Sequence, residues 1–214
     1  MDRSDMMHVM YDKKGPAVVK NFEKRNFEAY YCPTVEEALE KAISLIPAMD
    51  VVSWGGSVSI AEIGLQEDVK KHNPVIDRDT AKTPAERVEI MRQGLTCDTF
   101  IMSTNAATED GQLFNIDGNG NRLAALMFGP RQVIIIAGMN KVEPTLEAAI
   151  ARACSTAAPI NAQRFDMQTP CKVNGMCADC LSPQSICNQF VRTRRNSGPK
   201  GRIKIILVGE NLGF

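Results

Sequence analysis

The sequence predicts an α/β domain whose mainly parallel sheet is flanked by helices. Two continuous apolar runs, "DTFIMS" at 98–103 and "QVIIIAG" at 132–138, are typical of strands buried on both faces. A third run, "RIKIILVG" at 202–209, has the same character, and helical segments alternate with such strands along most of the chain. This alternation is the pattern of parallel strands joined by helical crossovers.

The elements before the first long apolar run follow from caps and periodicity. We expect a helix that starts at Pro16 and runs through Phe22 and Phe27, followed by a short strand, "FEAYYC". Thr34 and Glu37 form a capping box for a helix that ends before Pro47. The next predicted elements are a strand "DVVSW", one amphipathic helix "SIAEIGLQEDVKK", and a helix that starts at Pro84 and ends at Gly94.

Length and charge limit the function classes. The 214 residues are enough for one domain, predicted over 1–214, in which 161–201 breaks the helix–strand alternation and reads as an insertion. Lysine and arginine number 25, as do aspartate and glutamate, so the charge gives no reason to expect nucleic acid or membrane as a partner. No apolar run approaches a membrane span, and the N-terminus lacks a signal-peptide core. We therefore predict a cytoplasmic protein, and the sequence does not decide between monomer and homo-oligomer.

A glycine–serine turn follows the strand "DVVSW". Gly55 and Gly56 allow a close approach of the backbone to a ligand, and Ser57 and Ser59 add hydroxyl groups. The helix start that follows favours an anionic group. The alternative is a tight turn in which one serine caps the helix.

A polar loop at 104–122 follows the strand "DTFIMS". In parallel sheets ligands bind at the carboxyl ends of the strands, so both segments fall where a site is expected. We predict catalytic acid–base roles for Glu109 and Asp110. The predicted substrate-binding residues of this loop are Asn105, Asp117, Asn121 and Arg122. The alternative is a hairpin, because "EDG" and "DGNG" form turns and "QLFNI" alternates like a strand.

Four of the seven cysteines lie within seventeen residues, in "CKVNGMCADCLSPQSIC". Their spacing, C-x5-C-x2-C-x6-C, could complete a tetrahedral zinc site or hold a 4Fe–4S cluster. The predicted metal ligands are Cys171, Cys177, Cys180 and Cys187. Cys32, Cys97 and Cys154 stand in apolar surroundings and are expected to be small buried side chains.

Four stretches together resemble the LUD-domain (lactate-utilisation) family: "VVSWGGSVSIAEIGL", "STNAATEDGQLFNIDGNGNRLAALMFGPRQVIIIAGMNKV", "AAPINAQRF" and "TPCKVNGMCADCLSPQSICN". The resemblance is strongest to short, stand-alone members with a cysteine-rich segment. It implies a fold similar to that of ribose-5-phosphate isomerase, glucosamine-6-phosphate deaminase and the CoA transferases. It implies no reaction for the short members, and the two tandem ferredoxin motifs of some larger lactate-oxidising subunits are missing.

Two function classes follow. In the first, the protein binds an anionic small metabolite at the glycine–serine turn. In the second, it is an accessory electron-transfer or assembly subunit whose metal is redox-active or only structural. The basic run at 191–204 is either a solvated loop or a rim that attracts a phosphate, a carboxylate or the acidic face of a redox partner subunit. The link of the family to electron transfer favours an iron–sulphur cluster as the cofactor, and zinc is the alternative.

Overall fold

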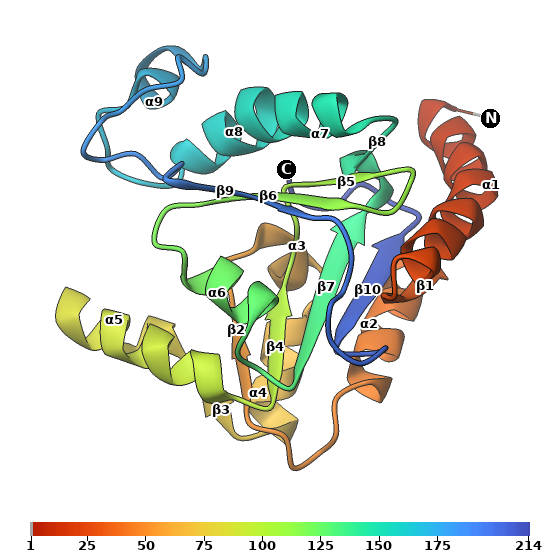
Figure 1. The fold of residues 1–214 in the computed structure, drawn as a ribbon, viewed down its shortest axis with the longest axis horizontal. Helices are drawn as coiled ribbons and strands as arrows, with labels where there is room; N and C mark the ends of the chain where they lie inside the picture. Colours follow the sequence, from red (N-terminus) through yellow and green to blue (C-terminus); the bar gives the residue numbers. More distant parts are fainter. Residues whose placement is uncertain (1) are drawn as a thin grey trace.

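The computed structural model describes residues 2–214 and has two sheets (Figure 1). The larger sheet has six parallel strands in the order β1-β10-β7-β4-β2-β3. Its strands are β1 (Glu28–Cys32), β2 (Val52–Trp54), β3 (Val75–Ile76), β4 (Thr99–Met102), β7 (Gln132–Gly138) and β10 (Ile203–Val208). The four runs predicted as inner strands are β2, β4, β7 and β10, and all four are inner strands. The predicted fold class is confirmed.

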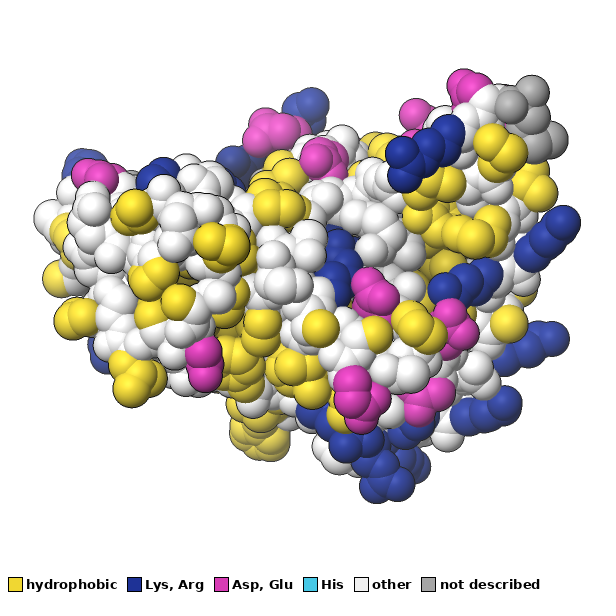
Figure 2. All heavy atoms as spheres, turned by 90° about the horizontal axis from the view of Figure 1, so that it is seen from above, with side chains coloured by type: hydrophobic (Ala, Val, Ile, Leu, Met, Phe, Trp, Pro, Cys, Tyr) yellow, Lys and Arg dark blue, Asp and Glu magenta, His cyan; other side chains and the backbone are white. Residues whose placement is uncertain are grey.

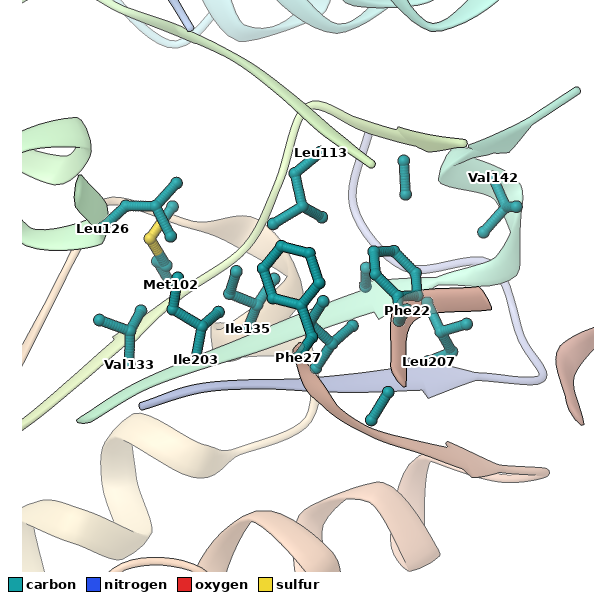
Figure 3. Packing of buried hydrophobic residues seen from close by; sticks show 14 of the residues in the cluster. Phe22, Phe27, Met102, Leu113, Leu126, Val133, Ile135, Val142, Ile203 and Leu207 are labelled. Carbon is teal, nitrogen blue, oxygen red and sulfur yellow. The ribbon is translucent and has the colours of Figure 1, made fainter. Parts of the chain in front are cut away.

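Helices cover both faces of this sheet (Figure 1). The helices before β7 are α1 (Arg3–Lys24), α2 (Val35–Ser44), α3 (Val58–Glu62), α4 (Leu65–His72), α5 (Pro84–Gln93) and α6 (Asn121–Met127). After β7, α7 (Leu146–Arg152) packs on the second sheet, and α8 (Ala158–Ala162) and α9 (Pro170–Asn174) follow it. Alternate residues of β7 enter different cores. Ile135 packs with Phe22 of α1 and Leu126 of α6 (Figure 3), whereas Ile134 packs in a cluster with side chains of α2 and α4. This period of two explains why an unbroken apolar run marks a strand buried on both faces.

The smaller sheet has four strands in the order β8-β5-β6-β9. They are β5 (Ala106–Thr108), β6 (Leu113–Asp117), β8 (Val142–Glu143) and β9 (Gln189–Thr193). β5 and β6 form an antiparallel hairpin, so the alternative considered for the loop at 104–122 is what the chain forms. β9 brings the end of the 161–201 segment against β6, with Leu113 opposite Thr193 and Asp117 opposite Gln189.

Two helices differ from their predicted extent. The first begins at Arg3 rather than Pro16, because Asp2 and Asp5 cap it reciprocally through hydrogen bonds of 2.9 and 3.0 Å. Pro16 lies inside this helix. The segment predicted as one helix after the glycine–serine turn is two, α3 and α4, because Gly64 takes a left-handed conformation with φ of 75°. Within residues 2–214 no helix is long and apolar enough to cross a membrane.

Candidate functional site

A cavity of about 420 Å³ lies at the carboxyl ends of β2 and β4. The turn after β2 and the segment after β4 both line it, through Ser57, Ser59, Asn105 and Asp117 among others. The structure therefore brings together the two segments that the sequence placed at strand ends. Parallel strands point their carboxyl ends to one edge, which is the physical reason for this convergence.

Gly55 and Gly56 make room for arginine side chains. A Cβ atom at Gly55 would lie 2.8 Å from Cδ of Arg122, and one at Gly56 would lie 2.5 Å from Nη2 of Arg78. A side chain at either position would force the neighbouring arginine to move. The glycines thus allow the aliphatic part of Arg122 and the guanidinium group of Arg78 to lie against the turn. Of the two glycines, only Gly56 lines the cavity.

The helix that follows this turn is short. α3 has five residues, and its N-cap Ser57 accepts a hydrogen bond from the backbone N–H of Ile60 at 3.3 Å. One of the backbone N–H groups that we expected to bind an anion is therefore already hydrogen-bonded to Ser57. Ser59 lies 1% exposed, and its hydroxyl faces Lys141.

Arg122, at the start of α6, connects three strand ends. Its Nη1 donates to the backbone oxygen of Ser103 at 3.0 Å and to Oδ1 of Asn115 at 2.8 Å. Its Nη2 donates to Oδ1 of Asn105 at 3.1 Å and to the backbone oxygen of Ile116 at 2.6 Å. Burial lowers the pKa of Arg122, and the nearby carboxylate of Asp117 opposes that effect. Because these acceptors occupy the guanidinium, Arg122 positions the site and has little capacity left for a ligand.

Two atoms at the cavity wall are buried and without hydrogen-bond partners within residues 2–214. They are Nε of Arg78 and Oδ2 of Asp117. The nearest carboxylate contact of Arg78 is Asp79, at 4.0 Å, and the side chain is 16% exposed. Oδ1 of Asp117 accepts hydrogen bonds from the backbone N–H groups of Asn119 and Gly120, both at 3.2 Å, and Oδ2 lies 3.6 Å from Nε of Arg122 without a hydrogen bond. Buried polar atoms are nearly always paired in proteins, so this donor and this acceptor call for a ligand or water.

Lys141 also lines the cavity, after the end of β7, and is 3% exposed. Its Nζ donates to the hydroxyl of Ser59 at 2.9 Å and to that of Ser103 at 3.1 Å. Burial lowers the pKa of Lys141 to about 7. The positive charges of Arg152 and Arg122 also lower it, whereas the negative charge of Glu62 raises it.

Glu109 and Asp110 lie outside this cavity. They form the turn at the far end of the β5–β6 hairpin, where Glu109 pairs with Lys14 of α1 at 2.6 Å. Asp110 pairs with Arg25 at 2.5 Å and accepts hydrogen bonds from Thr108 and Gln112. These contacts hold the hairpin to α1. The acid–base roles predicted for these two residues have no support from their position.

A second cavity, of about 360 Å³, lies under the cysteine-rich segment. It is lined by Cys171, Cys177, Cys180 and Cys187, and also by Cys154, which the sequence placed in the core. Burial raises the pKa of the Cys187 thiol to about 11, and the other four cysteines add to that shift. Within residues 2–214 no three side chains of the His, Cys, Asp and Glu types gather closely enough to hold one metal ion.

The two cavities share wall residues. Ile116 and Ile186 line both of them. The backbone of Ile186 packs on Gly118, because a Cβ atom at Gly118 would lie 3.2 Å from Cα of Ile186. In addition, the side-chain amide of Asn188 donates a hydrogen bond to the backbone oxygen of Gly118 at 3.0 Å. The end of the cysteine-rich segment is therefore part of the wall of the first cavity.

Comparisons with known proteins identify the family. The family model of the LUD domain matches residues 16–208. The chain belongs to the LUD-domain family. A solved structure with this fold, a DUF162 family protein from Deinococcus radiodurans, has a TM-score of 0.54 at 12% sequence identity. The match covers 92% of this chain and 97% of that chain. A search of curated proteins finds none that matches.

Lys141 and Arg78 of this LUD-domain cavity were among the residues that the sequence did not predict. Lys141 follows the buried strand β7 by three residues, and the rule that sites form at the carboxyl ends of strands would have found it. Arg78 had no such signal. It belongs to a short 3₁₀ turn after the two-residue strand β3, and only the tertiary structure brings it against Gly56.

Proposed function

We propose that this LUD-domain protein binds a small anionic metabolite in the first cavity, with Arg78 contacting the anionic group. The observation that carries the proposal is the buried Nε of Arg78, which has no hydrogen-bond partner within residues 2–214. Burial lowers the pKa of this guanidinium despite the carboxylates of Asp79 and Asp117. A buried N–H group that makes no hydrogen bond is costly, and a bound carboxylate or phosphate offsets that cost through a charge-assisted hydrogen bond.

The other polar groups of the cavity suit the rest of such a ligand. Oδ2 of Asp117 makes no hydrogen bond, although Nε of Arg122 lies 3.6 Å away, so it can accept one from a ligand hydroxyl. Arg164 lines the cavity as a further cation. Asn121, also predicted to bind substrate, lines the same wall. An anion with a hydroxyl or carbonyl group a few bonds away therefore matches this set of donors and acceptors.

Replacing Arg78 with glutamine tests the proposal. A hydrogen bond to a charged group contributes about 1.5–3 kcal/mol, so we expect Arg78→Gln to weaken anion binding roughly 10- to 100-fold. Isothermal titration calorimetry with L-lactate, pyruvate, ribose 5-phosphate and orthophosphate measures the affinity. Arg131→Gln is the matched control, because the Arg131 side chain is 89% exposed. Equal affinity in Arg78→Gln and wild type would contradict the role of Arg78, and the failure of every anion to bind would contradict the proposal.

We also propose that the second cavity holds a metal centre, which is the basis of the alternative function in electron transfer or assembly. Five thiols around one cavity form a donor set that suits iron or zinc. The predicted ligands are Cys171, Cys177, Cys180 and Cys187. An iron–sulphur cluster would supply one-electron chemistry.

The cysteine-rich segment has few apolar contacts of its own. Val173 is 72% exposed, Met176 67% and Leu181 100%. Figure 2 shows hydrophobic side chains on the surface at the end of the molecule that carries α9. A segment that buries so little needs another source of order, and metal–thiolate bonds would supply it.

Metal removal is therefore expected to loosen this segment alone. In anaerobically purified protein, Cys177→Ser should lose the metal and give new proteolytic cuts confined to 161–201, while the sheet survives. Cys154→Ser should keep the metal content of the wild type, because Cys154 is outside the predicted ligand set. Metal analysis, visible absorbance and limited proteolysis with mass spectrometry measure these outcomes. An unchanged digestion pattern in metal-free protein would contradict the structural role.

A further inference from the structure

Lys141 is a buried lysine without an ion-pair partner. Lys14, Lys70 and Lys204 each have a carboxylate oxygen within 4.0 Å, whereas no such contact reaches Nζ of Lys141 from any residue in 2–214. Its two contacts are the hydroxyl oxygens of Ser59 and Ser103. The charge of an ammonium in these surroundings would have no carboxylate oxygen within 4.0 Å, and Glu62 acts on it only from a greater distance.

The contacts of Nζ match those of a neutral amine. A neutral amine has two N–H groups and one lone pair, and the two serines accept two hydrogen bonds. The hydroxyl of Ser59 lies 3.4 Å from the backbone oxygen of Leu212, and that of Ser103 lies 3.5 Å from that of Thr104. Both hydroxyls can therefore donate to carbonyls while they accept from Nζ. The lone pair is then left for a ligand.

We infer that Lys141 is a nucleophile that forms an imine with an aldehyde or ketone group of the anionic ligand. This inference rests on the proposed function, because Lys141 and Arg78 line the same cavity. The nitrogen lone pair attacks the carbonyl carbon, and the C=O bond is replaced by C=N. Both N–H hydrogens leave with the carbonyl oxygen as one water molecule, so no oxidant or reductant is needed.

The electrostatics of the site favour this step. A lysine acts as a nucleophile only when it is deprotonated, and burial together with neighbouring cations is the usual way to achieve that. Burial, Arg152 and Arg122 lower the pKa of Lys141 to about 7, with Glu62 opposing them. A large fraction of the amine is then neutral at physiological pH. The substrate class is therefore a small anion that carries a carbonyl group.

Reductive trapping tests the inference. The full chain is incubated with sodium cyanoborohydride and either pyruvate, a 2-oxo acid, or dihydroxyacetone phosphate, a phosphorylated ketone. We expect one adduct, mapped to the peptide that contains Lys141, and the probe that gives it distinguishes a carboxylate from a phosphate ligand. Lys141→Met should lose the adduct, whereas Lys13→Met, a change on the exposed face of α1, should keep it. The trapping rate should rise through about pH 7 and then level off, unlike that of exposed lysines.

The outcomes separate this inference from the proposed function. Peptide mapping locates the adduct on the wild-type protein, so the test does not depend on whether Lys141→Met folds. If an anion with a carbonyl group binds in the calorimeter but leaves Lys141 unmodified, imine formation is contradicted, whereas the proposed anion binding is not. If glycolaldehyde, a neutral aldehyde, modifies Lys141 as fast as either anion does, and Arg78→Gln changes no rate, the amine's reactivity stands and anion binding by Arg78 is overturned.

Discussion

Lys141→Met is expected to stabilise the protein at neutral pH and to remove a rise in stability between about pH 7 and pH 10. Burial lowers the pKa of Lys141 to about 7 in the folded protein, whereas a solvated lysine, as in the unfolded chain, has a pKa of 10.5. Between these values the unfolded chain binds a proton that the folded chain does not. The free energy of unfolding of the wild type therefore increases with pH in this window, by about 1.4 kcal/mol per pH unit from this group.

The size of the gain follows from the same window. At pH 7 or below the wild type carries nearly the full cost of burying the ammonium, on the order of 4–5 kcal/mol. Methionine has a similar length and no charge. The hydroxyls of Ser59 and Ser103 lose a donor but lie 3.4 Å from each other and near backbone oxygens, so few hydrogen bonds are left unmade.

Urea unfolding of both proteins from pH 6 to pH 9 measures the effect. The difference between the curves is the informative quantity, because the buried thiols of Cys32, Cys97 and Cys187 titrate identically in both proteins. Lys13→Met controls for the loss of a surface lysine. A difference that does not change with pH would mean that Lys141 is charged in the folded protein across this range.

The fold could be predicted because burial leaves a direct trace in the sequence. A strand covered on both faces must be apolar at every position, as the buried run from Val133 to Gly138 is. Local signals were equally direct at Thr34 and Thr83, whose hydroxyls accept hydrogen bonds from Glu37 and Glu86. The break at Gly64 was missed because an isolated glycine in a helical pattern is often tolerated.

The site was only partly predictable, for a geometric reason. The polar loop after β4 folds into a hairpin, and a hairpin has two ends. Asn105 and Asp117 lie at the end that faces the cavity, whereas Glu109 and Asp110 lie at the turn that contacts α1. Composition alone does not distinguish these ends. Arg78 reaches the cavity through long-range packing, which no pattern of neighbouring residues encodes.

Arg122→Met is expected to cause the largest loss of stability among the substitutions considered. The guanidinium donates to two backbone oxygens and two amide oxygens, and its Nε lies 3.6 Å from Oδ2 of Asp117. Methionine keeps much of the side-chain volume but none of these donors. Removing one member of a buried charged network leaves its partners unpaired, and the expected cost is about 3–5 kcal/mol in the free energy of unfolding.

Two further variants separate charge from geometry. Arg122→Lys keeps the positive charge, but one ammonium group cannot reach all the acceptors that the guanidinium contacts through Nη1 and Nη2. We therefore expect its stability to lie between those of the wild type and Arg122→Met. Arg131→Met removes an exposed arginine and should change the free energy of unfolding by less than about 0.5 kcal/mol. Urea unfolding at one pH measures all three. If Arg122→Met were no less stable than Arg131→Met, Arg122 would not hold the ends of β4, β5 and β6 together, and the cavity wall would need another explanation.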